Sequence, residues 1–220
     1  MIEFVEASVD GRLQSVSLRL TERRVAVIGS NGSGKSTLAR LVNGLVEPTT
    51  GRVEVDGLDT RRDGREVRRR VGFVFTDPSA QLVMPTVAED VALSLRKRYR
   101  AKADREAAAL AVLERFGLAD LADRSVHALS GGQRQMLAIA TVLATDPRVL
   151  VADEPTTLLD LANTRRIGDV LLGLAQQLVL VTHDLELAAR CDRALVVHDG
   201  RIAFDGPAAE AVDVYKALVS

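Results

Sequence analysis

A glycine-rich segment that directly follows a short apolar run limits the possible folds of this chain more than any other stretch. The apolar run is Val25-Ala26-Val27-Ile28, and it is followed by Gly29-Ser30-Asn31-Gly32-Ser33-Gly34-Lys35-Ser36. This segment fits the pattern G-x-x-x-x-G-K-[ST], whose glycines let backbone N–H groups turn inward toward phosphate oxygens. The run predicts a buried strand, and residues 36–45 predict a helix with an apolar stripe of Leu38, Leu41, Val42 and Leu45. Together they predict a phosphate-binding loop in an α/β protein.

The side chains after the glycines supply the chemistry expected of such a loop. Lys35 places a positive charge where the β- and γ-phosphates would lie, and Ser36 offers a hydroxyl to Mg²⁺. The N-terminal end of the helix directs its positive dipole at the same anion. We therefore predict a nucleotide-binding set of Gly29, Ser30, Asn31, Gly32, Ser33, Gly34, Lys35, Ser36 and Thr37.

Polar groups follow two later apolar runs. Asp153 and Glu154 come directly after residues 149–152, and His183 comes shortly after residues 178–181. In open α/β sheets, ligands bind at the carboxyl ends of the strands. We expect Asp153 to hold Mg²⁺ through water, Glu154 to act as general base on the attacking water, and His183 to contact the γ-phosphate. Taken alone, the acidic pair also fits a solvated loop, and the histidine also fits a structural role.

The order of predicted elements indicates the fold class. Apolar strands at residues 149–152, 178–181 and 194–197 are separated by helical patterns, which favours a mostly parallel sheet covered on both faces. Residues 52–55 predict a strand that ends in a tight turn at Asp56-Gly57, and Asp199-Gly200 marks a closing hairpin. Residues 77–145 are rich in alanine and leucine and predict helices at 103–116 and from 131 past Ala144 to Pro147. We expect a single α/β domain over 1–220, with a small antiparallel part and an inserted helical subdomain.

Composition narrows the possible functions. The formal net charge is -1, which gives no overall attraction to nucleic acid, and we expect no nucleic-acid partner. The basic run at residues 61–70 fits a solvated helix face. Cys191 is the only cysteine, so no intrachain disulfide can form. No apolar run approaches the ~18 residues that span a bilayer, and the start of the chain does not read as a signal peptide, so we expect any membrane role to depend on a partner.

A third motif makes the pattern specific to one family. Leu129-Ser130-Gly131-Gly132-Gln133 resembles the signature of ATP-binding-cassette (ABC) ATPases, a P-loop NTPase family. Thr157-Leu158-Leu159-Asp160 resembles the family's D-loop, and Thr182-His183-Asp184 its H-loop. The resemblance implies ATP hydrolysis with Mg²⁺ in a dimer of two cassettes, either a homodimer or a heterodimer with a similar ATPase. It also implies that residues 129–133 act on the ATP held by the partner subunit.

A finer resemblance concerns residues 71–91. The placement of Gln81, Thr86-Val87 and Asp90-Val91 is similar to that in ATPases of energy-coupling-factor (ECF) importers. This implies an ATPase that powers uptake of a vitamin, with biotin as the leading candidate, or of a transition metal ion. It further implies integral membrane coupling and substrate-binding subunits as partners. The expected location is the cytoplasmic face of a bacterial cell membrane, with the chain bound peripherally.

Two positions depart from the family pattern. Thr76 stands where the resemblance places the Q-loop glutamine, so we expect hydrolysis or coupling to differ there. No Phe, Tyr, Trp or His lies between Phe4 and Phe73, so the usual aromatic platform for adenine is missing, and Val9 or a neighbour is expected to pack there. Two other functions remain open: a soluble ABC protein acting on nucleic acid or ribosomes, and an ordinary P-loop kinase or GTPase. Neither accounts for the chain as well as a transport ATPase. Soluble ABC proteins usually carry paired cassettes, which this sequence lacks, and an ordinary kinase or GTPase would not explain residues 129–133.

Overall fold

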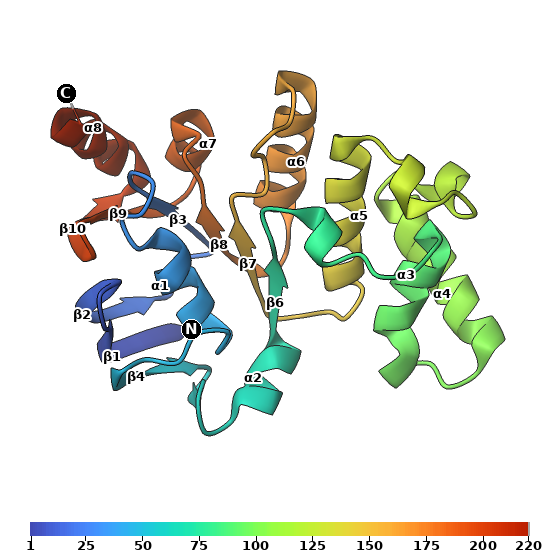
Figure 1. Cartoon of the computed structure of the whole chain (residues 1–220), viewed down its shortest axis with the longest axis horizontal. Coiled ribbons are helices and arrows are strands. Elements are labelled where there is room, and N and C mark those ends of the chain that lie inside the picture. The colour runs from blue at the N-terminus through green and yellow to red at the C-terminus, as the bar shows by residue number, and fades with distance from the viewer. Residues whose placement is uncertain (220) are drawn as a thin grey trace.

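The computed structural model describes residues 1–219, which form two β-sheets and a set of surrounding helices (Figure 1). The smaller sheet is antiparallel, with the order β2 (Leu13–Leu20), β1 (Ile2–Val9), β4 (Thr50–Val55) and β5 (Leu58–Asp59). The larger sheet has the order β10 (Arg201–Pro207), β9 (Arg193–His198), β3 (Arg24–Ile28), β8 (Gln177–Val181), β7 (Val149–Asp153) and β6 (Val71–Val74). Its strands pair in parallel except for β10, which is antiparallel to β9. The predicted fold class is confirmed, including the small antiparallel part.

Helices follow most of the strands of the larger sheet. They are α1 (Lys35–Val42), α2 (Gly64–Arg70), α3 (Val87–Ser94), α4 (Lys102–Arg115), α5 (Gly131–Leu143), α6 (Leu161–Gly173), α7 (Leu185–Ala189) and α8 (Ala208–Val219). Short 3-10 turns are η1 (Pro78–Ala80), η2 (Leu95–Lys97), η3 (Ala119–Leu121) and η4 (Val126–Ala128). Among residues 1–219, no helix combines the length and the apolar character that a transmembrane span requires.

The central strands are buried on both faces, which explains their continuous apolar sequences. In β3, Ala26 and Ile28 face a core shared with the outer helices, whereas Val25 and Val27 face a second core shared with α1 and the antiparallel sheet. Strands β7 and β8 divide their residues between the two cores in the same alternating way. Helix α1 therefore lies between the two sheets, and the loop that precedes it is held at the carboxyl end of β3.

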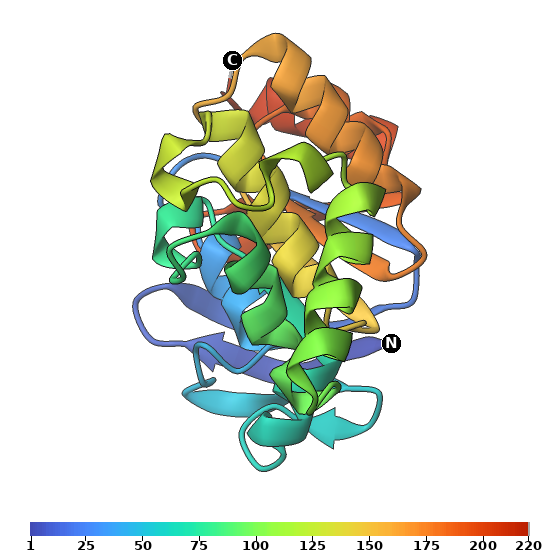
Figure 2. The same ribbon diagram turned by 90° about the vertical axis from the view of Figure 1, so that its right-hand side faces the viewer.

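The chain between β6 and β7 contains helices and no strand. Helices α3, α4 and α5 gather at one side of the molecule, away from the antiparallel sheet (Figures 1 and 2). This segment corresponds to the predicted helical region at residues 77–145. Gln135 of α5 donates to the carbonyl oxygen of Phe75 at 3.4 Å, and Gln81 donates to that of Ala138 at 3.0 Å. These two amides connect α5 to the segment that leaves β6.

Two predicted helix ends are wrong. The helix expected over residues 36–45 ends at Val42, because Gly44 takes a left-handed φ of 69° and turns the chain, leaving Leu45 exposed rather than on the buried stripe. Helix α5 ends at Leu143 rather than near Pro147, and Asp146 adopts a φ of 55° in the turn that follows. The basic run forms α2, where Val67 is buried and the arginines are exposed or half-buried, as predicted for a solvated face.

Candidate nucleotide-binding and hydrolysis site

The glycine loop is fixed closely against the tip of the β1–β2 hairpin. Gly34 has a φ of 109°, and a Cβ atom at this position would lie 2.8 Å from the backbone oxygen of Arg12. Only glycine meets both conditions, because other residues rarely adopt this φ and have no room here. Helix α1 begins at the next residue, so its first-turn N–H groups face the loop.

Lys35 lies inside the loop rather than in solvent. Its side chain is 5% exposed, and its Nζ donates to the backbone oxygens of Gly29 and Ser30, both at 2.8 Å. Burial lowers the pKa of Lys35 from its ordinary value, while the carboxylates of Glu154 and Asp153 act in the opposite direction. The loop therefore holds a positive charge at the place where an anion would bind.

Ser36 and Asp153 meet across the gap between α1 and β7. The Ser36 hydroxyl donates to Asp153 Oδ1 at 2.8 Å, and Arg40 Nη2 lies 3.3 Å from Asp153 Oδ2. Asp153 is 1% exposed, so these contacts compensate for the burial of its carboxylate. A hydroxyl and one carboxylate oxygen, completed by substrate phosphates and water, form the type of donor set that Mg²⁺ prefers. The residues present thus fit the predicted metal site.

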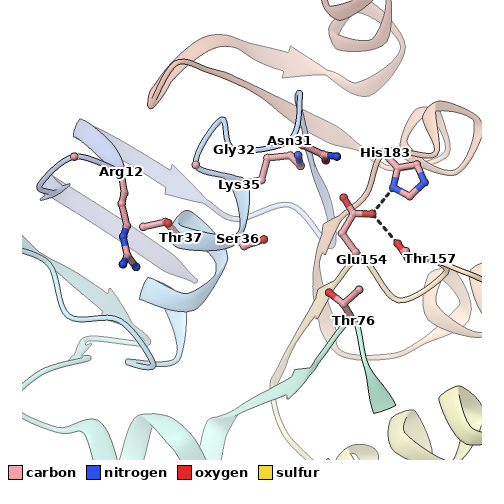
Figure 3. A pocket seen from close by; sticks show the side chains of 12 residues that line it. Arg12, Asn31, Gly32, Lys35, Ser36, Thr37, Thr76, Glu154, Thr157 and His183 are labelled. Atoms are coloured by element: carbon pink, nitrogen blue, oxygen red, sulfur yellow. Dashed lines mark hydrogen bonds and ion pairs between the residues drawn. The ribbon is translucent and has the colours of Figure 1, made fainter. Parts of the chain in front are cut away.

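Glu154 occupies a strained backbone position at the end of β7. Its φ is 54°, a left-handed value that non-glycine residues seldom adopt, and its N–H donates to the carbonyl oxygen of Val181 at 2.9 Å. The neighbouring carboxylates of Asp153 and Glu154 contact different residues. Glu154 Oε2 lies 2.5 Å from His183 Nδ1, and the Thr157 hydroxyl donates to the same oxygen at 3.2 Å (Figure 3). The two residues predicted to be catalytic are therefore in direct contact.

Thr76, the predicted Q-loop position, lies at the same cavity. Its hydroxyl donates to the backbone oxygen of Asp153 at 2.8 Å. Gln81 does not take the place of the expected glutamine, because both ends of its amide already have partners. Its Oε1 accepts from the Phe75 N–H at 3.4 Å, and its Nε2 donates to the Ala138 carbonyl oxygen. Position 76 therefore supports the strand end that carries the acidic pair.

One cavity brings together nine of the predicted site residues. Its volume is about 480 Å³, and it is lined by Gly11, Arg12, Asn31, Gly32, Gly34, Lys35, Ser36, Thr37, Thr76, Glu154, Thr157 and His183 (Figure 3). Gly29, Ser30 and Ser33 complete the loop behind this lining, and Ser33 is buried. Asp153 lies beneath the cavity, bonded to Ser36.

The signature segment does not reach this cavity. Ser130 caps α5: its hydroxyl accepts from the Gln133 N–H at 3.2 Å, and its own N–H donates to Gln133 Oε1 at 2.9 Å. Ser130 and Gly131 are exposed, Leu129 is buried, and Gly132 lies against Asn163 of α6. The signature motif is thus presented on the surface of the described structure, separate from the chain's own phosphate loop.

Asp160, the D-loop residue, caps the next helix. Its carboxylate accepts from the backbone N–H and from the side-chain amide of Asn163, both at 2.8 Å. These hydrogen bonds lower the pKa of Asp160. Like Ser130, it lies outside the cavity, and Asn163 connects the Asp160 cap to Gly132 of the signature.

The sequence did not predict the site contacts of three residues. Arg12 lines the cavity, Arg40 pairs with Asp153, and Thr157 binds Glu154. Arg40 could have been found, because it follows Ser36 by four residues and so shares its helix face. Nothing in the local sequence places Arg12 near the loop, since that approach depends on how the two sheets pack.

Comparisons with known proteins identify the family of this chain. Residues 13–157 match the model of a family described as ABC transporter. The chain is 48% identical over 208 residues to BioM, a biotin transport ATP-binding protein of Rhizobium etli, which covers 94% of this chain and 92% of that protein. It is 46% identical over 199 residues to EcfA2, an energy-coupling factor transporter ATP-binding protein of Symbiobacterium thermophilum, covering 86% of this chain and 69% of that one.

Solved structures give the same result. The structure of cbiO1 from Clostridium perfringens, part of the ABC transporter complex cbiONQ, has a TM-score of 0.86 and 30% identity, and covers 99% of this chain and 92% of that one. A dimeric ATP-binding cassette in a post-hydrolysis state with ADP and Pi has a TM-score of 0.82 and 31% identity, and covers 94% of this chain and 99% of that one. These matches confirm the predicted resemblance to ABC ATPases and to those of ECF importers. The chain belongs to the family of ABC transporter ATP-binding proteins.

Proposed function

We propose that this chain is the ATP-hydrolysing subunit of an ECF-type importer and that the imported solute is biotin. The observation that carries the hydrolytic role is the cavity in which the loop with Lys35 faces the contact between Glu154 and His183. The similarity to BioM and EcfA2 supports the type of importer and, through BioM, the solute.

Binding rests on groups that are already in position. The triphosphate would lie along the glycine loop, where backbone N–H groups and the Lys35 ammonium neutralise its charge. Ser36 and Asp153 would hold Mg²⁺, which when bound supplies positive charge to the β- and γ-phosphates. Thr76 keeps the Asp153 carbonyl in place and so supports this donor set.

Hydrolysis requires a base beside the γ-phosphate. Glu154 accepts a proton from water while the water oxygen bonds to the γ-phosphorus and the bond to the β-phosphate oxygen breaks, leaving ADP and phosphate. His183, at 2.5 Å from Glu154, orients this carboxylate and can contact the transferred phosphate. Thr157, three residues further along the same loop, donates to the same carboxylate oxygen.

A second cassette would complete each site. Leu158 is 99% exposed and Leu161 is 63% exposed, and both follow Glu154 closely in the chain. Apolar side chains so exposed beside a polar cavity are typical of a surface that meets a partner. We infer that a second copy, or a similar ATPase, covers this surface and brings its own residues 129–133 to the nucleotide.

Transport would require integral membrane coupling and substrate-binding subunits, with the chain bound peripherally at the cytoplasmic face. The test co-expresses this chain with candidate coupling and biotin-binding subunits from the same genome and measures uptake of labelled biotin into ATP-loaded vesicles. We expect complex formation and ATP-dependent uptake that Glu154→Gln abolishes. An intact complex that shows the same uptake with Glu154→Gln would contradict the role of this chain as the motor. Failure to form a complex would favour a soluble ABC function.

A further inference from the structure

The two ends of the cavity are lined by different residues. Glu154 and His183 stand at one end, Ser36 and Thr37 lie between, and Arg12 stands at the opposite end (Figure 3). Lys35 serves the β- and γ-phosphates and Glu154 faces the γ-phosphate, so the γ end of a nucleotide is fixed. The nucleoside must then leave the loop toward Arg12.

A second hollow continues from that end. It has a volume of about 550 Å³ and is lined by Ser8, Val9, Asp10, Gly11, Arg12, Leu13, Gln14, Gly32, Asp199 and Gly200. It shares Gly11, Arg12 and Gly32 with the phosphate cavity, so the two spaces meet at Arg12. No Phe, Tyr or Trp of the described residues lines either space.

The backbone of Arg12 is rigidly placed relative to the loop. Its N–H donates to the Val9 carbonyl at 3.0 Å, and its own carbonyl lies against Gly34 and Gly200. Gly200 in turn donates to the Ser33 carbonyl at 2.9 Å. These contacts tie the hairpin tip to the glycine loop.

The side chain of Arg12, in contrast, is exposed and has no hydrogen bond or ion pair with any residue in the range 1–219. The backbone of Arg12 is thus fixed at the mouth of the nucleotide cavity, while its guanidinium has no partner within the described residues. Such a side chain is suited to contact a ligand rather than to stabilise the fold.

We propose that the Arg12 guanidinium stacks on the purine ring of the bound nucleotide and replaces the missing aromatic platform. A guanidinium is planar and delocalised, and it stacks on π faces with an added cation–π attraction. Such a contact recognises the face of a base and not its edge, so it accepts adenine and guanine alike. This inference rests on the proposed nucleotide site.

Binding measurements on the purified chain test the proposal. Calorimetric titrations with ATP, GTP and inorganic tripolyphosphate compare wild type with Arg12→Ala, Arg12→Lys and Arg12→Phe. Arg12→Ala should weaken ATP and GTP binding by about 3- to 30-fold and leave tripolyphosphate binding within about twofold. Arg12→Phe should restore purine binding, whereas Arg12→Lys should not, because an ammonium has charge without a plane. Arg65→Ala, an exposed arginine of α2 outside the two cavities, is the matched control.

Several results would overturn the stacking role. Equal losses of ATP and tripolyphosphate binding in Arg12→Ala, or full rescue by Arg12→Lys, would make Arg12 a phosphate contact. Unchanged ATP binding in Arg12→Ala would remove Arg12 from the site while leaving the proposed function intact. If the wild-type chain bound no ATP, the proposed function itself would fail. The Arg12→Phe variant distinguishes loss of stacking from misfolding. Stacking predicts that Arg12→Phe regains purine affinity, whereas a general folding defect at position 12 does not.

Discussion

The phosphate loop and the signature segment are both rich in glycine and both begin helices, yet they are built in opposite ways. At the loop, Lys35 and Asp153 are buried and bonded to neighbours from other parts of the chain. At the signature, Ser130 is exposed and its polar groups are bonded only to Gln133 and Arg134, both in the first turn of the same helix. The loop is assembled by the tertiary fold, whereas the signature is complete as a local motif and faces outward.

This difference fits our proposal that the chain carries the two halves of a composite active site. A buried half that is hydrogen-bonded to other parts of the chain is preorganised and acts on a ligand within its own chain. An exposed half with satisfied caps is stable alone and is free to meet another molecule. Mutations should therefore act within one chain at the loop and between chains at the signature.

Glu154→Gln should give the largest effect. The amide cannot accept a proton from water, so kcat should fall by about 1,000-fold while ATP binding is retained. Steady-state phosphate release and ATP titration measure the two quantities, and Mg·ATP should then hold the variant as a dimer on size-exclusion chromatography. Glu114→Gln, on the exposed side of α4, is the control. Normal turnover by Glu154→Gln would refute the assignment of the base.

Lys35→Ala should be next. It removes a buried cation from the loop, and ATP binding should weaken by about 100-fold. Calorimetric titration measures the dissociation constant, and circular dichroism checks the fold. The control is Lys102→Ala, whose ammonium is exposed and paired only with Glu106. An unchanged dissociation constant would show that the triphosphate does not lie along this loop.

Ser130→Arg should affect hydrolysis and spare binding. Because residues 129–133 lie outside the chain's own cavity, ATP affinity should stay within about twofold while ATPase activity falls by about 10- to 100-fold. Mixing this variant with Lys35→Ala sharpens the test, since a mixed dimer has one composite site without either lesion. Partial recovery of ATPase is expected. Absence of recovery in verified mixed dimers would mean that each chain works alone, which would break the contrast between the two regions.

Thr76→Val should give the smallest effect. It removes the hydroxyl that supports the Asp153 carbonyl, and kcat should fall by about 2- to 10-fold, as expected for one hydrogen bond. Thr145→Val is a matched control, because that hydroxyl also donates to a backbone carbonyl but lies away from the cavity. Thr76→Gln, which introduces the residue typical of the family, should instead raise the ATPase rate of the assembled complex. Equal rates for all of these variants would exclude position 76 from the machinery.

The sequence predicted the site where local rules apply. Strand ends located Asp153, Glu154 and His183, and the glycine pattern located Lys35 and Ser36, because parallel strands deliver their carboxyl ends to one edge. The helix ends at Val42 and Leu143 were missed, because single residues with left-handed backbone decide them. Arg12 was missed for a different reason: it reaches the cavity through contacts between two sheets, which no local pattern encodes. The binding and catalytic roles assigned to the residues of the strand ends and the glycine loop remain predictions, as do those of residues 129–133 and Asp160.

The left-handed backbone at Glu154 has a thermodynamic consequence. A non-glycine residue in this conformation costs about 1–2 kcal/mol of folding free energy, a sizeable part of the 5–15 kcal/mol that stabilises a typical domain. Glycine or asparagine would adopt the same φ with less strain, but neither carries a carboxylate. Stability is thus reduced at the position of the proposed general base, where a carboxylate is needed. Engineering guided only by stability would include Glu154 among the left-handed positions that it replaces, and would yield a more stable protein without the proposed base.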